Sequence, residues 1–137
     1  MFSAKIRPMK NSALILGVFF TFSAALAAAP ETTTFEVGGK KTTFHRDMEK
    51  HLTISADCKK DGKGQFTCQA YQALKKATLK KAKAADLAGG VNPGAYICDS
   101  VVKGKIVYGF DSKRNEQTFC EFQDGSRISN GSLHAAA

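Results

Sequence analysis

Hydrophobic and polar positions follow three patterns along the 137-residue chain. A continuous apolar run lies near the N-terminus, and short alternating segments follow it and recur in the last third. A stripe at helical spacing lies between them. Continuous runs are typical of signal or membrane segments, whereas alternation and helical spacing indicate strands and helices. The pattern therefore predicts an exported or anchored N-terminus followed by a mixed α and β domain.

The middle of the chain carries the helical pattern. Residues 66–88 contain no glycine or proline and are rich in alanine, lysine and leucine, which favour helix. One stripe of this predicted helix consists of Tyr71, Leu74, Thr78, Ala82 and Ala85. Gly89 and Gly90 follow and predict its end. Because the stripe is made mostly of small residues, the helix can lie close to a sheet.

Alternating segments on both sides of this helix predict strands. Residues 35–45 read as a hairpin around Gly38 and Gly39, and residues 52–55 as a further strand. In the last third, the predicted strands cover residues 95–102, 105–110, 117–122 and 126–129. The expected fold class is therefore α+β, with one lysine-rich helix packed on a small antiparallel β-meander and stapled by disulfides.

The N-terminal apolar run predicts a cleaved signal peptide over residues 1–27. Lys5, Arg7 and Lys10 precede the run, and Ala25 and Ala27 supply the small residues that a signal peptidase accepts. The alternative is an uncleaved anchor, but residues 13–29 are short and partly polar for a span of roughly 20 apolar residues. No cysteine lies near the cleavage site, which argues against a lipoprotein.

Cleavage leaves a chain of single-domain size that is expected to work in the periplasm or outside the cell. We expect a flexible leader over residues 28–34, one α+β domain over residues 35–133 and a disordered tail over residues 134–137. No other segment is apolar enough to span a bilayer, so the mature protein is expected to lack a transmembrane segment.

The net charge concentrates in the predicted helix. Removing the basic signal lowers the formal charge from +8 to about +5. Five lysines can account for this excess, and they are Lys75, Lys76, Lys80, Lys81 and Lys83. Such a basic face suits an anionic envelope component, such as lipid head groups or lipopolysaccharide. The alternative is a solvated face without a partner. Few aromatic residues lie nearby, so we expect no specific binding of nucleic acid.

The four cysteines predict structural disulfides, because an even number in a small exported chain is typical of a disulfide framework. Of the three pairings, we favour Cys58–Cys68 with Cys98–Cys120, since residues 61–64 can turn the chain between the first pair. Closely spaced cysteine pairs typical of zinc or thioredoxin-like sites are absent from the sequence. We therefore expect neither a metal nor redox chemistry.

No constellation of residues predicts catalysis or a cofactor. His45, His51 and His134 are scattered, and no metal-binding histidine motif occurs. Ser126 follows Asp124 and Gly125 in a run that is explained by turn chemistry, and no nucleophile elbow is present. Residues 130–132 match the short glycosylation pattern.

Two motifs in the last third carry a family resemblance. Residues 92–98 read NPGAYIC, and residues 119–126 read FCEFQDGS. Over residues 92–133 the chain resembles a family of small bacterial envelope proteins of unknown function, often labelled haemolysins. The chain departs from the family pattern at Ile128 and Gly131, where members usually carry a cysteine and a tryptophan. The resemblance implies a small cysteine-linked envelope domain.

The leading hypothesis is therefore a non-enzymatic exported domain with a structural or binding role in the cell envelope. One alternative is a cationic membrane-active or toxin-like protein, motivated by the lysines and by the family label. Another is a protease inhibitor or a small enzyme, with residues 111–116 as the candidate inhibitory loop by position only.

Overall fold

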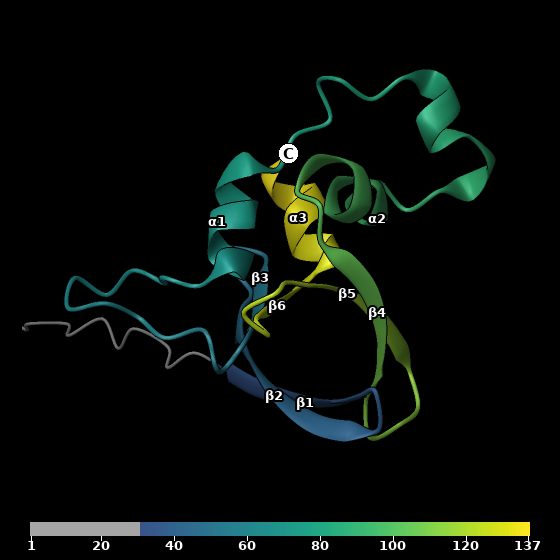
Figure 1. Cartoon of the computed structure of the whole chain (residues 1–137). Coiled ribbons are helices and arrows are strands. Elements are labelled where there is room, and N and C mark those ends of the chain that lie inside the picture. Colours follow the sequence, from purple (N-terminus) through teal and green to yellow (C-terminus); the bar gives the residue numbers. More distant parts are fainter. Residues whose placement is uncertain (1–30) are drawn as a thin grey trace, which may run out of the picture.

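The computed structural model describes residues 31–137, which form a closed antiparallel barrel with strand order β1-β2-β3-β6-β5-β4 (Figure 1). The strands are β1 (Glu31–Val37), β2 (Lys40–Asp47), β3 (Leu52–Ser55), β4 (Lys105–Phe110), β5 (Glu116–Glu121) and β6 (Arg127–Ser129). The predicted α+β fold with one helix on a meander is therefore wrong, because the sheet closes on itself and the helices are short.

The barrel consists of two three-stranded meanders that are joined at both edges. Strand β1 pairs with β4 at Glu36 opposite Phe110 and at Val37 opposite Gly109. Strand β3 pairs with β6 through Ile54 opposite Ile128. Both junctions connect distant parts of the chain, so they leave no local pattern in the sequence. These two pairings close the two meanders into one barrel, so the sheet has no unpaired edge strand.

Local alternation did predict the individual strands well. The expected hairpin over residues 35–45 corresponds to β1 and β2, which turn at Gly38 and Gly39 with φ values of 58° and 76°. Two consecutive positive φ angles match the hairpin turn that glycine favours. The strands expected at residues 52–55, 105–110, 117–122 and 126–129 agree with β3, β4, β5 and β6 to within a few residues.

Aromatic residues fill the interior of the barrel. Phe35, Val37, Phe44 and Phe119 form one buried cluster, against which Val107 packs. The rings of Phe44 and Phe119 stack with centroids 4.4 Å apart, and Phe35 meets both rings edge-on. Such aromatic pairs add to the free energy gained by burying apolar area.

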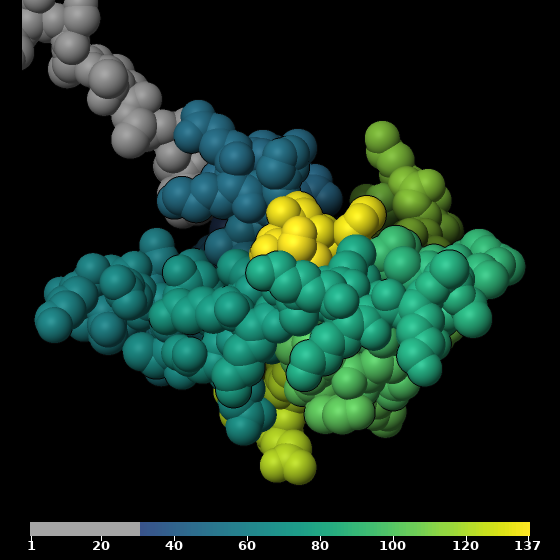
Figure 2. Space-filling view, turned by 90° about the horizontal axis from the view of Figure 1, so that it is seen from above, coloured from purple at the N-terminus to yellow at the C-terminus, as the bar shows by residue number. Residues whose placement is uncertain are grey.

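The helices gather on one side of the barrel and enclose a second core (Figure 1). They are α1 (Gln69–Lys76), the 3₁₀ segment η1 (Ala84–Gly90), α2 (Pro93–Tyr96), the π-helical segment η2 (Ile97–Val101) and α3 (Asn130–Ala136). This second core contains Ile54 and Ile128 from the strands with Ala70, Ile97 and Leu133 from the helices. Figure 2 views this side, across which the teal segment around α1 extends.

The predicted helix over residues 66–88 is wrong in length, because α1 covers only Gln69–Lys76. Its first residue follows Cys68, which is disulfide-bonded to Cys58. At Ala77 the backbone leaves the helical region, with φ −59° and ψ 128°. The residues beyond Ala77 are mostly alanine and lysine, so a longer helix would have little apolar surface to bury.

The predicted strand over residues 95–102 is also wrong, because α2 and η2 occupy this segment. Asn92 caps α2, and its Oδ1 accepts hydrogen bonds from the N–H groups of Gly94 at 2.9 Å and Ala95 at 3.3 Å. Pro93 occupies the first helical turn, where its fixed φ favours helix. This helix-start signal outweighs the β-branched composition of the segment.

The two ends of the described chain are more ordered than the sequence predicts. Strand β1 begins at Glu31, inside the segment expected to be a flexible leader. Helix α3 continues to Ala136, through most of the expected tail. The predicted signal peptide lies outside the described residues. Within residues 31–137, no helix combines the length and apolar character that a membrane crossing requires.

Candidate binding groove

The five lysines of the predicted basic face do not share one helix face. Lys75 and Lys76 lie in the last turn of α1, Lys80 and Lys81 lie in the connection that follows, and Lys83 precedes η1. The continuous helix that would have aligned these five side chains is absent.

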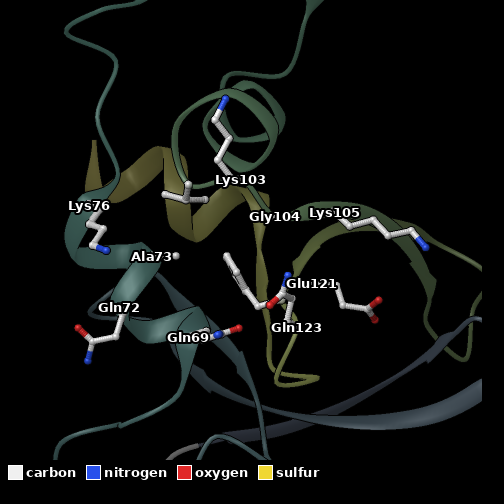
Figure 3. Close-up of a pocket in the computed structure, with 11 residues that line it drawn as sticks. Gln69, Gln72, Ala73, Lys76, Lys103, Gly104, Lys105, Glu121 and Gln123 are labelled. Carbon is white, nitrogen blue, oxygen red and sulfur yellow. The ribbon is translucent and has the colours of Figure 1, made fainter.

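A polar groove of about 500 Å³ lies between α1, the connection from η2 to β4, and the hairpin of β5 and β6 (Figure 3). One wall is a single face of α1, formed by Gln69, Gln72 and Lys76, whose spacing places them on the same side of a helix. The opposite wall includes Lys103 and Lys105. The groove therefore brings one of the predicted lysines together with two that the sequence analysis missed.

The groove is rich in positive charge. Within residues 31–137, none of Lys76, Lys103 and Lys105 takes part in an ion pair. The acidic lining residue Glu121 lies opposite Lys105 in the β4–β5 register. Its carboxylate is already bound by Arg127, with the guanidinium Nη2 at 2.7 Å. The three lysines thus supply positive charge that the groove itself does not neutralise.

The lysine side chains surround the groove instead of meeting at one point. In Figure 3, Lys76, Lys103 and Lys105 extend in different directions from the elements that carry them. All three side chains are exposed. A compact ion would contact one ammonium group at a time, whereas an extended anionic partner could contact several. The arrangement is therefore better suited to a polymer than to a single small anion.

The second disulfide fixes the backbone between Lys103 and Lys105. The N–H of Gly104 donates a 2.8 Å hydrogen bond to the carbonyl of Cys98. A Cβ atom at Gly104 would lie 2.3 Å from the Sγ atom of Cys120, so only glycine fits beside the Cys98–Cys120 bond. Lys103 adopts a positive φ of 57° as the chain leaves η2. Two groove lysines are thus held on a constrained turn.

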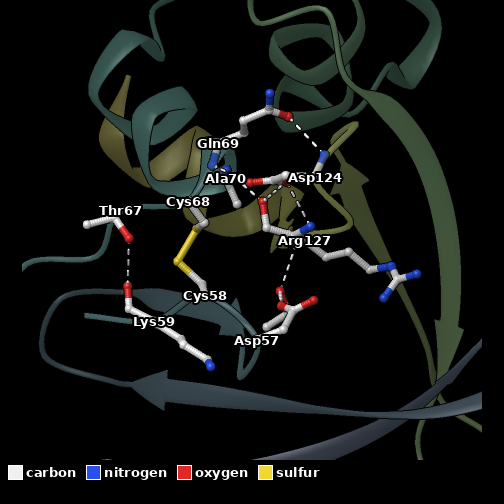
Figure 4. The surroundings of a disulfide bond; sticks show 11 residues. Asp57, Cys58, Lys59, Thr67, Cys68, Gln69, Ala70, Asp124 and Arg127 are labelled. Carbon is white, nitrogen blue, oxygen red and sulfur yellow. Dashed lines mark hydrogen bonds between the residues drawn. A yellow bond between two sulfur atoms is a disulfide. The ribbon is translucent and has the colours of Figure 1, made fainter. Parts of the chain in front are cut away.

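Both disulfides have the predicted pairing. Cys58 is bonded to Cys68, and Cys98 is bonded to Cys120. The first bond closes a narrow loop, which is strengthened by two hydrogen bonds from Thr67 to the carbonyl of Lys59 (Figure 4). The second bond is fully buried in the core under the helices.

The Asp-Gly-Ser run of the family resemblance has a structural role. Asp124 Oδ2 accepts a 2.8 Å hydrogen bond from the N–H of Gln69, and Ser126 Oγ accepts one of 3.0 Å from the N–H of Ala70 (Figure 4). Desolvation raises the pKa of the Asp124 carboxyl, but the hydrogen bonds from Gln69 and Ser126 outweigh it and hold the pKa below its usual value. The hairpin of β5 and β6 therefore caps α1, and Ser126 takes part in this cap.

The other candidate residues do not come together. His45 lies on β2, His51 lies in the turn before β3, and His134 lies on α3. In the part of the chain that the structure describes, no group of three histidine, cysteine or acidic residues could hold a metal ion. Asn130 of the glycosylation pattern is fully buried, so the folded domain cannot present it to a transferase.

The candidate inhibitory loop over residues 111–116 is a compact turn. Asp111 Oδ1 accepts hydrogen bonds of 2.8 Å from the N–H groups of both Lys113 and Asn115. The Asn115 side chain donates a further bond of 2.8 Å to Asp111 Oδ2. The hydrogen bonds from Asn115, led by that of its side chain, keep the pKa of Asp111 below its usual value. This loop turns back on itself instead of presenting an extended segment to a protease.

Comparisons of the chain with family models, with curated proteins and with solved structures find no match. The resemblance of residues 92–133 to envelope proteins labelled haemolysins stays a prediction.

Proposed function

We propose that this protein is a non-enzymatic exported domain that binds an extended anionic component of the cell envelope in the groove between α1 and β4. The observation that carries the proposal is the placement of Lys76 from α1, and of Lys103 and Lys105 from the segment that leads into β4, around one polar hollow. The glutamines of the groove can donate and accept hydrogen bonds, which suits the hydroxyl groups of a polysaccharide. The partner is therefore an acidic glycan, with carboxylate or phosphate groups that contact the lysines.

The membrane-active alternative has less support than binding. Insertion into a bilayer surface requires an amphipathic helix with a substantial apolar face. Helix α1 has only 8 residues, and its buried residues are Ala70 and Ala73. The lysines that follow α1 lie in connections without such a face.

The test compares two triple variants of equal charge in the oxidised mature protein. K76Q/K103Q/K105Q removes the groove lysines, whereas the matched control K80Q/K81Q/K83Q removes three lysines outside the groove. Calorimetry with polygalacturonate as the acidic glycan and dextran as the neutral one measures binding. We expect wild type and control to bind polygalacturonate and not dextran, and the groove variant to bind roughly tenfold more weakly.

Equal losses in the two triple variants would contradict the proposal, because binding would then follow net charge alone. Absence of polygalacturonate binding by the wild-type protein would also contradict it. A parallel measurement of dye leakage from vesicles of phosphatidylglycerol tests the alternative, for which leakage is required and should weaken when the five lysines of the predicted basic face are replaced by glutamine.

A further inference from the structure

A second hollow, of about 240 Å³, lies on the other side of α1 from the groove residues. Its walls come from three places: the β2–β3 end of the barrel, the loop closed by Cys58–Cys68, and α1 itself. The groove described above uses Gln69, Gln72 and Lys76 of this helix, whereas the second pocket uses Tyr71 and Leu74. The two hollows share no lining residue, so they can be tested separately.

The inner wall of this pocket is apolar. Leu52, Phe66, Tyr71 and Leu74 line it, and the rings of Phe66 and Tyr71 lie with their centroids 5.4 Å apart. Phe66 is held in place by the closed loop, in which it pairs with Lys60 in a β-bridge. An apolar group of a ligand would gain free energy by leaving water for this wall, in proportion to the area it buries.

The same pocket has unpaired positive charge beside its apolar wall. The Nζ atom of Lys60 lies 4.9 Å from the centre of the Phe66 ring, so the ammonium group is next to the aromatic surface. Arg46 also lines the pocket, and within residues 31–137 neither Lys60 nor Arg46 forms an ion pair. The acid in the lining, Asp47, is paired with Lys50 at 3.1 Å.

A polar atom of the lining also lacks a partner. His45 lines the pocket, and its Nδ1 atom is buried without a hydrogen bond to any residue in the described chain. A buried nitrogen of this kind is costly unless a polar group satisfies it.

From this combination we infer that the pocket binds an amphipathic carboxylate, with an aromatic or branched apolar group against Phe66 and Tyr71 and a carboxylate toward Lys60 and Arg46. The planar guanidinium of Arg46 suits a carboxylate, because it can donate two parallel hydrogen bonds. The C-terminus of a peptide that ends in an apolar residue and a free acylated amino acid share this chemistry. The inference is independent of the proposed function of the groove.

The test uses N-acetyl-phenylalanine and its uncharged amide as probes of the oxidised protein. Backbone amide resonances are followed by NMR during titration, because they report both affinity and location. We expect the acid to bind with a Kd below about 5 mM and the amide to bind at least about fivefold more weakly. Shifts should concentrate at Lys60, Phe66 and Tyr71 and leave Lys103 and Lys105 unchanged.

Two lysines of the closed loop provide a matched comparison. K60Q removes the ammonium group beside Phe66 and should weaken binding of the acid by about three- to tenfold. K63Q removes an exposed lysine of the same loop that does not line the pocket, and its Kd should stay within about twofold of wild type. A second variant, L74F, places a larger side chain in the lining and should reduce binding of the acid.

The peptide Gly-Gly-Phe with a free C-terminus distinguishes the two sources of the ligand. Binding as tight as that of N-acetyl-phenylalanine supports a peptide end, and weaker binding supports a free acid. The inference is overturned if the acid does not bind, if acid and amide bind equally, or if K60Q and K63Q behave alike. Shifts confined to the groove would also overturn it, while leaving the proposed function of the groove intact.

Discussion

Asp124 caps helix α1 from 55 positions away along the chain, through a 2.8 Å hydrogen bond from the Gln69 N–H to its carboxylate. The contact is reciprocal, because the N–H of Asp124 donates to Oε1 of Gln69 at 3.2 Å. The residue that precedes the helix, Cys68, provides no side-chain cap of its own. The start of α1 is therefore stabilised by the hairpin of β5 and β6, and this contact positions one wall of the groove.

Replacing Asp124 with alanine should lower stability in a pH-dependent way. At pH 7 we expect a loss of about 1 kcal/mol in the free energy of unfolding, as for other helix caps. The pKa of Asp124 is lowered in the folded protein, so its stabilising effect is complete above the ordinary pKa that an aspartate has in an unfolded chain. The effect is lost as the pH falls through the lower folded pKa. Urea unfolding at pH 7 and at successively lower pH should show the difference between wild type and D124A shrinking.

Asp99 provides a control for this measurement, because it is exposed and its carboxylate accepts no hydrogen bond from residues 31–137. D99A should therefore leave the free energy of unfolding within about 0.5 kcal/mol of wild type at pH 7. A difference between D124A and wild type that stays constant down to strongly acidic pH would contradict a role for the ionised carboxylate.

Removal of the Cys98–Cys120 disulfide should mainly lower stability, whereas removal of the Cys58–Cys68 disulfide should mainly weaken ligand binding. In the loop-entropy model, each bond contributes about 3 kcal/mol, and C98A/C120A loses in addition the packing of two fully buried sulfur atoms. We therefore expect C98A/C120A to be the less stable variant in urea. C58A/C68A should retain the fold, yet bind N-acetyl-phenylalanine more weakly because its loop no longer holds Phe66. Unchanged binding by C58A/C68A would show that the pocket does not depend on this loop.

Replacement by alanine should have different effects on stability at two glycines, Gly94 and Gly131. A Cβ atom at Gly94 would lie 1.8 Å from the backbone oxygen of Asn130, the first residue of α3. G94A should therefore cost more than about 3 kcal/mol or prevent folding. At Gly131, in the first turn of α3, the nearest atom would lie at 3.9 Å, and alanine favours helix. Thermal unfolding of G131A should show an unchanged or higher Tm.

The features that the sequence predicted correctly are those that depend on residues close together along the chain. Alternation located the strands, and the turn-forming residues between Cys58 and Cys68 indicated the first disulfide. The closure of the barrel could not be predicted, because it depends on Ile54 meeting Ile128 and on Glu36 meeting Phe110. These contacts arise from the packing of both meanders, and no local propensity encodes them.

The candidate groove was predicted only in part for a related reason. The sequence grouped lysines that are close along the chain, and intrinsic helix propensity then placed all of them on one face. In the structure α1 ends at Lys76, and this residue lines one groove together with Lys103 and Lys105. The pair flanking Gly104 carried a weak signal in the sequence, since a glycine between two lysines marks a turn that presents both side chains.

Asn130 should be replaceable by leucine at no cost in stability. Its side chain is fully buried at the start of α3, and neither its Nδ2 nor its Oδ1 atom has a hydrogen-bond partner in residues 31–137. Burying an unsatisfied amide is unfavourable, whereas an apolar side chain of similar size avoids the desolvation penalty. N130L should therefore be as stable as wild type or more stable by up to about 2 kcal/mol in urea unfolding. N130D, which has almost the same shape but introduces a buried carboxyl group, should be destabilised, and more strongly at pH 7 than at pH 4. A large loss of stability in N130L would instead mean that the amide is hydrogen-bonded in solution, for example through an internal water molecule.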